Sequence, residues 1–211
     1  MNFYHSSLWR RMAVCLLSAF LPVLLAAGSP QLTGVSNFQK VSQTVYRGAQ
    51  PAELGFDSLA KLGIKTVVDL RLIGEHSQAE EQRLVEARGM RYVSVPMKGM
   101  STPTDEQVAK VLALFDDATA VPVFVHCQRG ADRTGAVIAC YRIGHDRWDN
   151  KKALSEARSY GMSWYQRALQ KYVIQYQPPQ KAAAAASGTG TLPATLPATQ
   201  GDPALQAPSV R

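Results

Sequence analysis

The sequence predicts an α/β fold with a central, mostly parallel sheet of about four to five strands flanked by helices. Two observations support this prediction. Between residues 37 and 176, short β-branched apolar runs alternate with longer stretches in which apolar residues recur at helical spacing. Glycine, proline or a helix-capping residue stands at most of the boundaries between these stretches. Parallel strands need a long crossover between them, and a helix between successive strands provides it.

Four apolar runs have the features of strands. They are rich in β-branched residues, and most are bounded by turn residues such as glycine or proline. After the first run, a turn is expected at residues 48–51. The four expected strands are residues 44–47, 64–70, 91–95 and 122–126.

Helical spacing and capping residues predict the helices between and after these strands. Thr104 and Gln107 have the spacing of a capping box, which would begin the third helix. In the first helix the apolar residues at helical spacing are Leu54, Leu59 and Leu62, which are expected to face the core. The expected helices are residues 53–62, 80–88, 104–115, 134–143, 150–160 and 164–176.

The two ends of the chain differ in composition from this central segment. Residues 1–28 combine two arginines with an apolar stretch and a final Ala-Ala-Gly, which predicts a cleaved signal peptide or, alternatively, an N-terminal anchor. Residues 178–211 are rich in alanine, proline, glycine and threonine. Such sequence buries too little apolar surface to offset chain entropy, so a disordered tail is expected. We therefore expect an exported, periplasmic protein whose single folded domain spans residues 37–176.

Charge and cysteine content exclude several other classes of protein. The chain has 211 residues, 23 basic and 16 acidic, with a formal charge of +7. Nucleic-acid binding is not expected, because no run of basic residues exceeds two and aromatic residues do not alternate with them. Three cysteines are too few for a disulfide framework. Cys140 is expected to be a small core residue, with an oxidative disulfide to Cys127 as the alternative.

The segment from His126 to Gly135 carries the chemistry. It reads His-Cys-Gln-Arg-Gly-Ala-Asp-Arg-Thr-Gly and lies between an expected strand and an expected helix. A tight turn there would aim successive backbone N–H groups at one point, and the helix N-terminus would add its positive end, as a phosphate requires. Arg133 would bind two phosphate oxygens with its planar fork. Cys127 would be held as a thiolate below this cradle, where it can act as a nucleophile in phosphoryl transfer.

This stretch resembles the His-Cys-(five residues)-Arg-Ser/Thr signature of cysteine-dependent protein tyrosine and dual-specificity phosphatases. The resemblance covers residues 45–176. The Tyr-Arg-Gly-Ala-Gln-Pro run at 46–51 and the Asp-Leu-Arg run at 69–71 resemble small bacterial members of the family, and the overall arrangement is similar to the plant-and-fungal atypical group. The resemblance implies a phosphocysteine intermediate on Cys127, and a Thr134 hydroxyl that donates to the thiolate. It further implies phosphoryl binding by Arg133, loop positioning by His126, and a cradle of backbone N–H groups that includes Gln128, Arg129, Gly130 and Ala131.

The general acid is the point at which the resemblance is incomplete. Relatives usually place an aspartate on the loop before the third helix, but residues 97–104 contain no carboxylate. Asp132, inside the cradle, resembles the loop aspartate of myotubularin-type lipid phosphatases, and we predict it as the acid. The alternatives are Asp105, whose ordinary role would be that of a first-turn helix acid, and no protein acid at all. Arg71 and Glu75 follow a strand end, where they would form an ion pair or contact substrate.

These features predict a metal-independent phosphatase that hydrolyses phosphomonoesters, above all phosphotyrosine and also phosphoserine or phosphothreonine. One alternative is an inositol phosphate or phosphoinositide phosphatase. The plant-and-fungal relatives, some of which act on inositol pyrophosphates, carry lysines where this chain has Gln128 and Ala131, which argues against that alternative. The other is a phosphate-binding module without turnover. No cofactor is expected, and a membrane contact only through an uncleaved N-terminal segment.

Overall fold

The computed structural model describes residues 31–179. The expected domain, residues 37–176, lies within this range. The expected signal peptide lies outside the described residues, as does nearly all of the expected tail. Among residues 31–179, no helix combines the length and the hydropathy that crossing a membrane would require.

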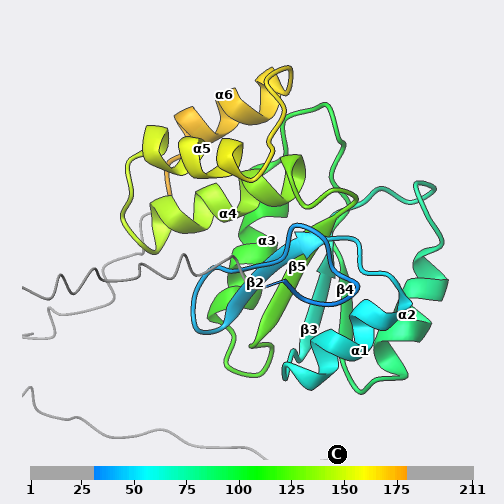
Figure 1. The fold of residues 1–211 in the computed structure, drawn as a ribbon. Coiled ribbons are helices and arrows are strands. Elements are labelled where there is room, and N and C mark those ends of the chain that lie inside the picture. Colours follow the sequence, from blue (N-terminus) through cyan, green and yellow to red (C-terminus); the bar gives the residue numbers. More distant parts are fainter. Residues whose placement is uncertain (1–30, 180–211) are drawn as a thin grey trace, which may run out of the picture. The chain divides into compact units, whose positions relative to one another are not determined.

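A five-stranded sheet forms the centre of the domain, which confirms the predicted fold class (Figure 1). The order of its strands is β1-β2-β5-β3-β4. Only the β1–β2 pair is antiparallel, and the other three pairs are parallel. The strands are β1 (Gln39–Lys40), β2 (Val45–Ala49), β3 (Thr66–Asp69), β4 (Arg91–Ser94) and β5 (Val123–Cys127).

The start of the sheet differs from the prediction. The turn expected at residues 48–51 begins later, because Gly48 and Ala49 continue β2 and pair with His126 and Cys127 of β5. This pairing joins residues almost eighty positions apart, so the local turn signal of glycine and proline was misleading. The short edge strand β1 was not predicted at all. Because Gly48 and Ala49 continue β2, this strand runs alongside β5 up to its last residue, next to the signature loop.

Within residues 31–179, six helices connect and cover the strands. The predicted capping box is confirmed, since Thr104 and Gln107 exchange side-chain to backbone hydrogen bonds at the start of the third helix. The last helix begins later than predicted, because residues 164–166 form a turn. The helices are α1 (Glu53–Lys61), α2 (Gln78–Glu86), α3 (Asp105–Asp116), α4 (Asp132–Gly144), α5 (Asn150–Ser159) and α6 (Arg167–Gln175).

The predicted apolar face of α1 was wrong in part. Leu59 is buried as expected, but Leu54 and Leu62 are exposed by 66% and 41%. Phe56 takes the core position instead, and the close approach of Gly55 to Gly34 turns that side of the helix inward. A large aromatic side chain buries more apolar area than leucine, so it determines which way this short helix faces.

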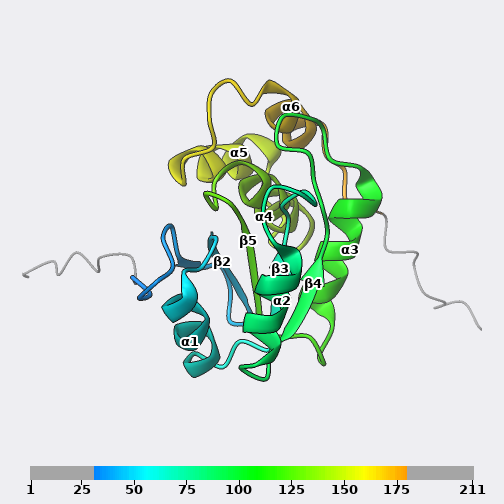
Figure 2. The same cartoon turned by 90° about the vertical axis from the view of Figure 1, so that its right-hand side faces the viewer.

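Helices cover both faces of the sheet (Figure 2). One cluster of buried side chains joins α1 and α2 to the sheet through residues such as Phe56, Val85 and Phe124. A second cluster joins α3, α4, α5 and α6 to the opposite face. Helix α4 lies between the sheet and the outer helices, and ten of its 13 residues are buried. Its N-terminus is thereby fixed at the C-terminal end of β5.

Candidate active site

The signature loop joins β5 to α4 as predicted. Cys127 is the last residue of β5 and is 2% exposed. Gly130 adopts a φ of +66°, and a Cβ at this position would lie 2.3 Å from the backbone of Gly48. Only glycine fits such a position, because it combines the left-handed conformation with direct backbone packing. The loop therefore turns tightly between a strand end and a helix N-terminus, the geometry in which backbone N–H groups converge on an anion.

A cavity of about 130 Å³ contains the predicted nucleophile and its arginine. The structure brings five predicted site residues together there. Gly130 and Ala131 lie in the loop but do not line the cavity. The lining residues are Cys127, Gln128, Arg129, Asp132 and Arg133, with Gly99, Met100 and Gln166 from two other loops.

Among the described residues, the guanidinium of Arg133 is held by hydrogen bonds from only one of its three nitrogens. Its Nη1 lies 3.0 Å and 2.9 Å from the two carboxylate oxygens of Glu75, and 3.2 Å from the carbonyl oxygen of Met97. Within residues 31–179, hydrogen bonds are found for Nη1 and not for Nε or Nη2. These two nitrogens form the edge of the guanidinium that matches two oxygens of a phosphoryl group. Of the two roles left open for Arg71 and Glu75, ion pairing or substrate contact, the structure shows ion pairs, but Glu75 pairs with Arg133 and Arg71 pairs with Asp69 and Glu81.

Asp132, the predicted acid, has both carboxylate oxygens engaged. Oδ1 accepts a hydrogen bond of 2.8 Å from the backbone N–H of Ser163, and Oδ2 accepts one of 2.6 Å from Arg129. Arg129 also donates to the Ser163 hydroxyl at 2.7 Å. These contacts tie the loop between α5 and α6 to the cradle. The alternative acid, Asp105, lines a separate cavity and accepts a hydrogen bond from Tyr172 at 2.8 Å.

Thr134 and His126 are both fully buried next to Cys127. Among the described residues, no hydrogen bond joins the Thr134 hydroxyl to Cys127. The imidazole of His126 lies on the far side of the loop, with Nδ1 3.4 Å from the carbonyl oxygen of Cys127 and Nε2 2.9 Å from Glu81. His126 therefore contacts the helix α2 more closely than it contacts the loop.

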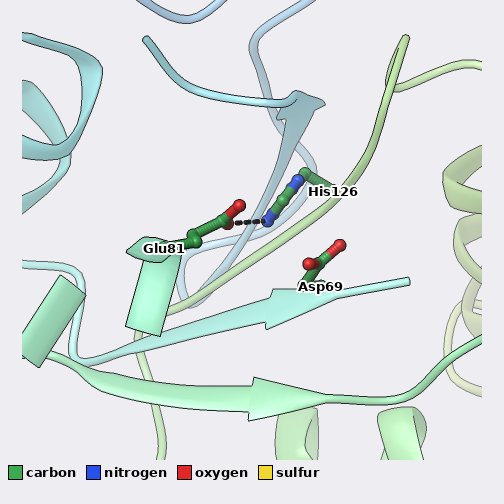
Figure 3. Close-up of side chains that lie close together, drawn as sticks. All are labelled: Asp69, Glu81 and His126. Atoms are coloured by element: carbon green, nitrogen blue, oxygen red, sulfur yellow. Dashed lines mark ion pairs between the residues drawn. The ribbon is translucent and has the colours of Figure 1, made fainter. Parts of the chain in front are cut away.

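Below the cradle, Asp69, Glu81 and His126 form a buried cluster from β3, α2 and β5 (Figure 3). Their ligand atoms lie within 4.8 Å of one another, a spacing that would suit a metal ion. Arg71, however, forms ion pairs with both carboxylates of this cluster. A guanidinium already supplies the positive charge, so the side chains fit a buried ion-pair network better than a cation site.

Similarity to known proteins agrees with this geometry. Residues 17–175 match the family described as "DSP-PTPase phosphatase fused to NAD+ Kinase". The chain belongs to this family. The described part is a DSP-PTPase domain, the phosphatase domain that carries the cysteine signature. Its mostly parallel sheet with the signature loop after β5 has the same fold as the solved phosphatases.

Two curated relatives of the DSP-PTPase domain carry different names. The inositol diphosphatase DSP3 of Arabidopsis thaliana is 27% identical over 139 residues, 64% of this chain and 67% of the relative. The dual specificity protein phosphatase TpbA of Pseudomonas aeruginosa is 32% identical over 126 residues, 59% of this chain and 55% of the relative. The chain thus spans about half to two thirds of the length of these relatives.

Solved structures of two phosphatases superpose on the DSP-PTPase domain. The crystal structure of P. aeruginosa TpbA has a TM-score of 0.58 at 29% identity, covering 67% of this chain and 86% of that one. The catalytic core of the S. cerevisiae PP-IP phosphatase SIW14, in complex with citrate, has a TM-score of 0.62 at 24% identity, covering 71% and 91%. At this lower identity the second likeness concerns the fold alone.

Sequence reasoning missed several residues of the DSP-PTPase site. Glu81 and Ser163 contact site residues that lie 31 or more positions away, and no local pattern indicates such pairs. Asn37 and Arg47 both donate to the carbonyl oxygen of Gly130, at 3.1 Å and 2.6 Å. The one available signal was the Tyr-Arg-Gly-Ala-Gln-Pro run that contains Arg47. That run marked the family but did not by itself indicate a contact with the loop.

The buried cluster predicts a strong dependence of stability on Asp69. Its carboxylate accepts two hydrogen bonds from the Arg71 side chain and one of 2.9 Å from Tyr92. Asp69→Asn leaves the Arg71 guanidinium buried with one anion fewer, and should lower the free energy of unfolding by about 3 kcal/mol. Urea denaturation near neutral pH measures this loss. Asp57→Asn is the matched control, because the Asp57–Arg88 ion pair lies at the surface, and it should have a much smaller effect.

The same carboxylate gives this difference a defined pH dependence. Burial alone would raise the pKa of Asp69, but the hydrogen bonds from Arg71 and the charge of His126 outweigh burial and hold the pKa below its usual range. Because the folded pKa lies below the unfolded value, the stabilisation is present above about pH 4 and is lost as the pH falls through the folded pKa. The stability gap between wild type and Asp69→Asn should therefore close in acid. A gap that stays constant with pH would contradict this assignment.

Proposed function

We propose that this chain is a protein phosphatase that hydrolyses single phosphomonoesters, phosphotyrosine first and phosphoserine or phosphothreonine second, through a phosphocysteine intermediate. The observation that carries the proposal is the charge balance of the cavity that contains Cys127. Two cations line it, Arg129 and Arg133, and each is already paired with a carboxylate. A site of about 130 Å³ with this balance suits one phosphoryl group held by an arginine fork and backbone N–H groups. A polyphosphorylated inositol would need further unpaired cations around it.

The loops around the cavity support a polypeptide as the carrier of that phosphoryl group. Met100 lines the cavity and is 64% exposed, while Trp164 and Tyr165 are 79% and 49% exposed. Trp164 directly follows Ser163, whose backbone N–H donates a hydrogen bond to Asp132. Exposed aromatic and methionine side chains around a polar centre are typical of surfaces that bind other proteins. A crystal structure of the relative TpbA is described as a complex with pTyr, which agrees with this choice.

In the proposed reaction the Cys127 thiolate attacks phosphorus, an S–P bond forms, and the bond from phosphorus to the ester oxygen breaks. Nε and Nη2 of Arg133 bind two of the phosphoryl oxygens and stabilise their charge in the transition state. The departing oxygen takes a proton from Asp132, the candidate acid that lines this cavity. Water then attacks the phosphocysteine and gives a proton to the Asp132 carboxylate, the S–P bond breaks, and inorganic phosphate and the thiolate are released with Asp132 protonated again.

A substrate panel tests the proposed function. We expect vanadate-sensitive hydrolysis of an aryl phosphate without added metal. The value of kcat/KM should be at least about tenfold higher for a phosphotyrosine peptide with leucine neighbours than for an inositol polyphosphate. A peptide with glycine neighbours is the matched control for the apolar loops. Preference for the inositol polyphosphate would support the second candidate function, which the name of the Arabidopsis relative suggests. Binding of phosphate without any turnover would leave a binding module.

The role of Asp132 can be tested through the leaving group. Asp132→Asn should lower kcat by about 10²-fold for phenyl phosphate, whose leaving oxygen needs a proton, and much less for an activated nitrophenyl phosphate. Arg129, one of the two partners that hold this carboxylate, is 55% exposed, so solvent can replace its hydrogen bond. Asp105→Asn is the control, and its effect should not depend on the leaving group. Equal losses of Asp132→Asn on both esters would instead assign Asp132 to anchoring the Ser163 loop.

A further inference from the structure

Arg47 is a fully buried arginine directly below the cradle. It lies on β2 with 0% exposure, and its pairing partner on β5 is Val125, two residues before Cys127. Its Nη2 donates a hydrogen bond of 2.6 Å to the carbonyl oxygen of Gly130. In a trans peptide the N–H points opposite to the C=O, so the N–H of Ala131 points away from the arginine. Arg47 thus fixes the orientation of one peptide unit of the cradle.

The charge of Arg47 has no carboxylate partner among residues 31–179. Its Nε and Nη1 are buried and have no hydrogen-bond partner in that range. The ring of Tyr160 lies 4.5 Å from the guanidinium carbon, which gives a cation–π contact but no opposite charge. Arg71, the other fully buried arginine, forms ion pairs with both Asp69 and Glu81. A buried cation without an anion is costly, so the difference between the two arginines needs an explanation.

The charges that act on Arg47 include that of the predicted nucleophile. Burial lowers the pKa of Arg47 to about 10, while the charges of Glu156, Cys127 and Tyr160 act to raise it. The guanidinium therefore stays positive at neutral pH. Glu156 is already bound to Arg142, at 2.9 Å. Glu156 therefore already has a cation, whereas the sulfur of Cys127, which the proposed reaction requires as a thiolate, has no hydrogen bond to a cationic side chain among residues 31–179.

We propose that Arg47 is a positioning residue of the active site: it anchors the Gly130 carbonyl and is the buried counter-cation of the Cys127 thiolate. Arg47 is fully buried and does not line the cavity of Cys127, whereas Arg133 lines it and serves the phosphoryl group. This inference uses Cys127 as the nucleophile of the proposed function, but its test needs no substrate. The two can therefore fail separately.

The experiment compares Arg47→Lys with Arg47→Gln. Lysine keeps the positive charge, whereas glutamine keeps an N–H donor for Gly130 and loses the charge. The full chain with Cys15→Ala and Cys140→Ala, in which Cys127 is the one remaining cysteine, is alkylated with iodoacetamide across a pH series. Other charged and titratable groups near Cys127 are the same in all variants, so they cancel in the comparison. They are His126, Glu75, Arg129, Asp132 and Arg133 around the loop, and Arg142, Glu156 and Tyr160 from α4 and the α5 region.

We expect Arg47→Gln to raise the pH of half-maximal alkylation by about one unit or more, and Arg47→Lys to leave it within a few tenths of a unit of wild type. Both variants should bind vanadate less tightly, because the hydrogen bond from Arg47 Nη2 to the Gly130 carbonyl is replaced by a bond from a shorter or differently shaped side chain. An unchanged alkylation midpoint in Arg47→Gln would overturn the counter-cation role and leave Arg47 as a clamp on Gly130. An equal upward shift in Arg47→Lys would overturn it as well. If Arg47→Gln does not fold, as judged by circular dichroism, Arg47→Met is used under the same two criteria.

Discussion

Replacing Cys127 by serine should abolish turnover, with kcat for an aryl phosphate lowered by at least about 10³-fold. The serine hydroxyl would occupy the same position at the end of β5, but it stays protonated at neutral pH and is a much weaker nucleophile. The donors of the cradle are unchanged by this substitution. The variant should therefore still bind a phosphopeptide. Its Kd should lie within several-fold of the wild-type Kd, which is measured by stopped-flow binding on reduced, vanadate-free protein.

Cys140→Ala is the control for this experiment. Cys140 is fully buried on α4 and does not line the cavity of Cys127. Burial raises the pKa of its thiol, so it stays protonated and unreactive. The alanine variant should keep wild-type turnover within a few-fold. Substantial activity in Cys127→Ser, or its loss in Cys140→Ala with the fold intact, would show that the nucleophile has been misassigned.

Arg133→Lys should lower kcat by about 10²–10³-fold although the charge is kept. The arginine does two things at once: Nη1 binds Glu75 and the Met97 carbonyl, while Nε and Nη2 remain for the phosphoryl oxygens. A lysine ammonium is a single point charge, so it can satisfy Glu75 or the phosphoryl group but not both. The inhibition constant for vanadate, which resembles the transition state, should rise in parallel with the loss of kcat.

Glu75→Gln separates the two functions of this arginine. Glutamine keeps an acceptor for Nη1 but removes the negative charge, so Arg133 stays near its position and its charge is less neutralised. We expect a loss of kcat of about tenfold or less, far smaller than that of Arg133→Lys. Similar losses in the two variants would mean that positioning by Glu75, and not the fork of Arg133, limits the reaction.

The parts of this domain that depend on neighbouring residues were predictable. The signature loop is a continuous stretch between an apolar strand and a helix, so its residues could be placed at one site before the structure was known. The capping box at Thr104 was predictable for the same reason, since its partner is three residues away. The strand continuing through Gly48 and Ala49 was not, because glycine and a following proline resemble a turn unless the pairing with β5 is known.

Contacts between residues that are far apart in the sequence could not be predicted. Arg47 and Gly130 are 83 positions apart, and Arg133 and Glu75 are 58 apart. A sequence shows that an arginine is present but not which acid, carbonyl or aromatic ring it meets. Arg71 illustrates the difficulty, because acids lie on both sides of it in the sequence, yet it pairs with Asp69 and Glu81 and not with Glu75. Which acid each arginine contacts depends on long-range packing. In the described residues, this packing gives Arg71 and Arg133 carboxylate partners and gives Arg47 none.

The burial of α4 has a consequence for how this domain can vary. The helix that begins at the cradle is also the most enclosed helix of the core, so the reaction chemistry and the cooperative unfolding unit share the same residues. A substitution in the first turn of α4, which contains Asp132, Arg133 and Thr134, would change catalysis and stability together. The loops with Met100 and Trp164 are exposed and are joined to the cradle mainly by hydrogen bonds. New substrate preferences can therefore arise by mutation of these loops while the thermodynamic stability of the scaffold stays nearly constant.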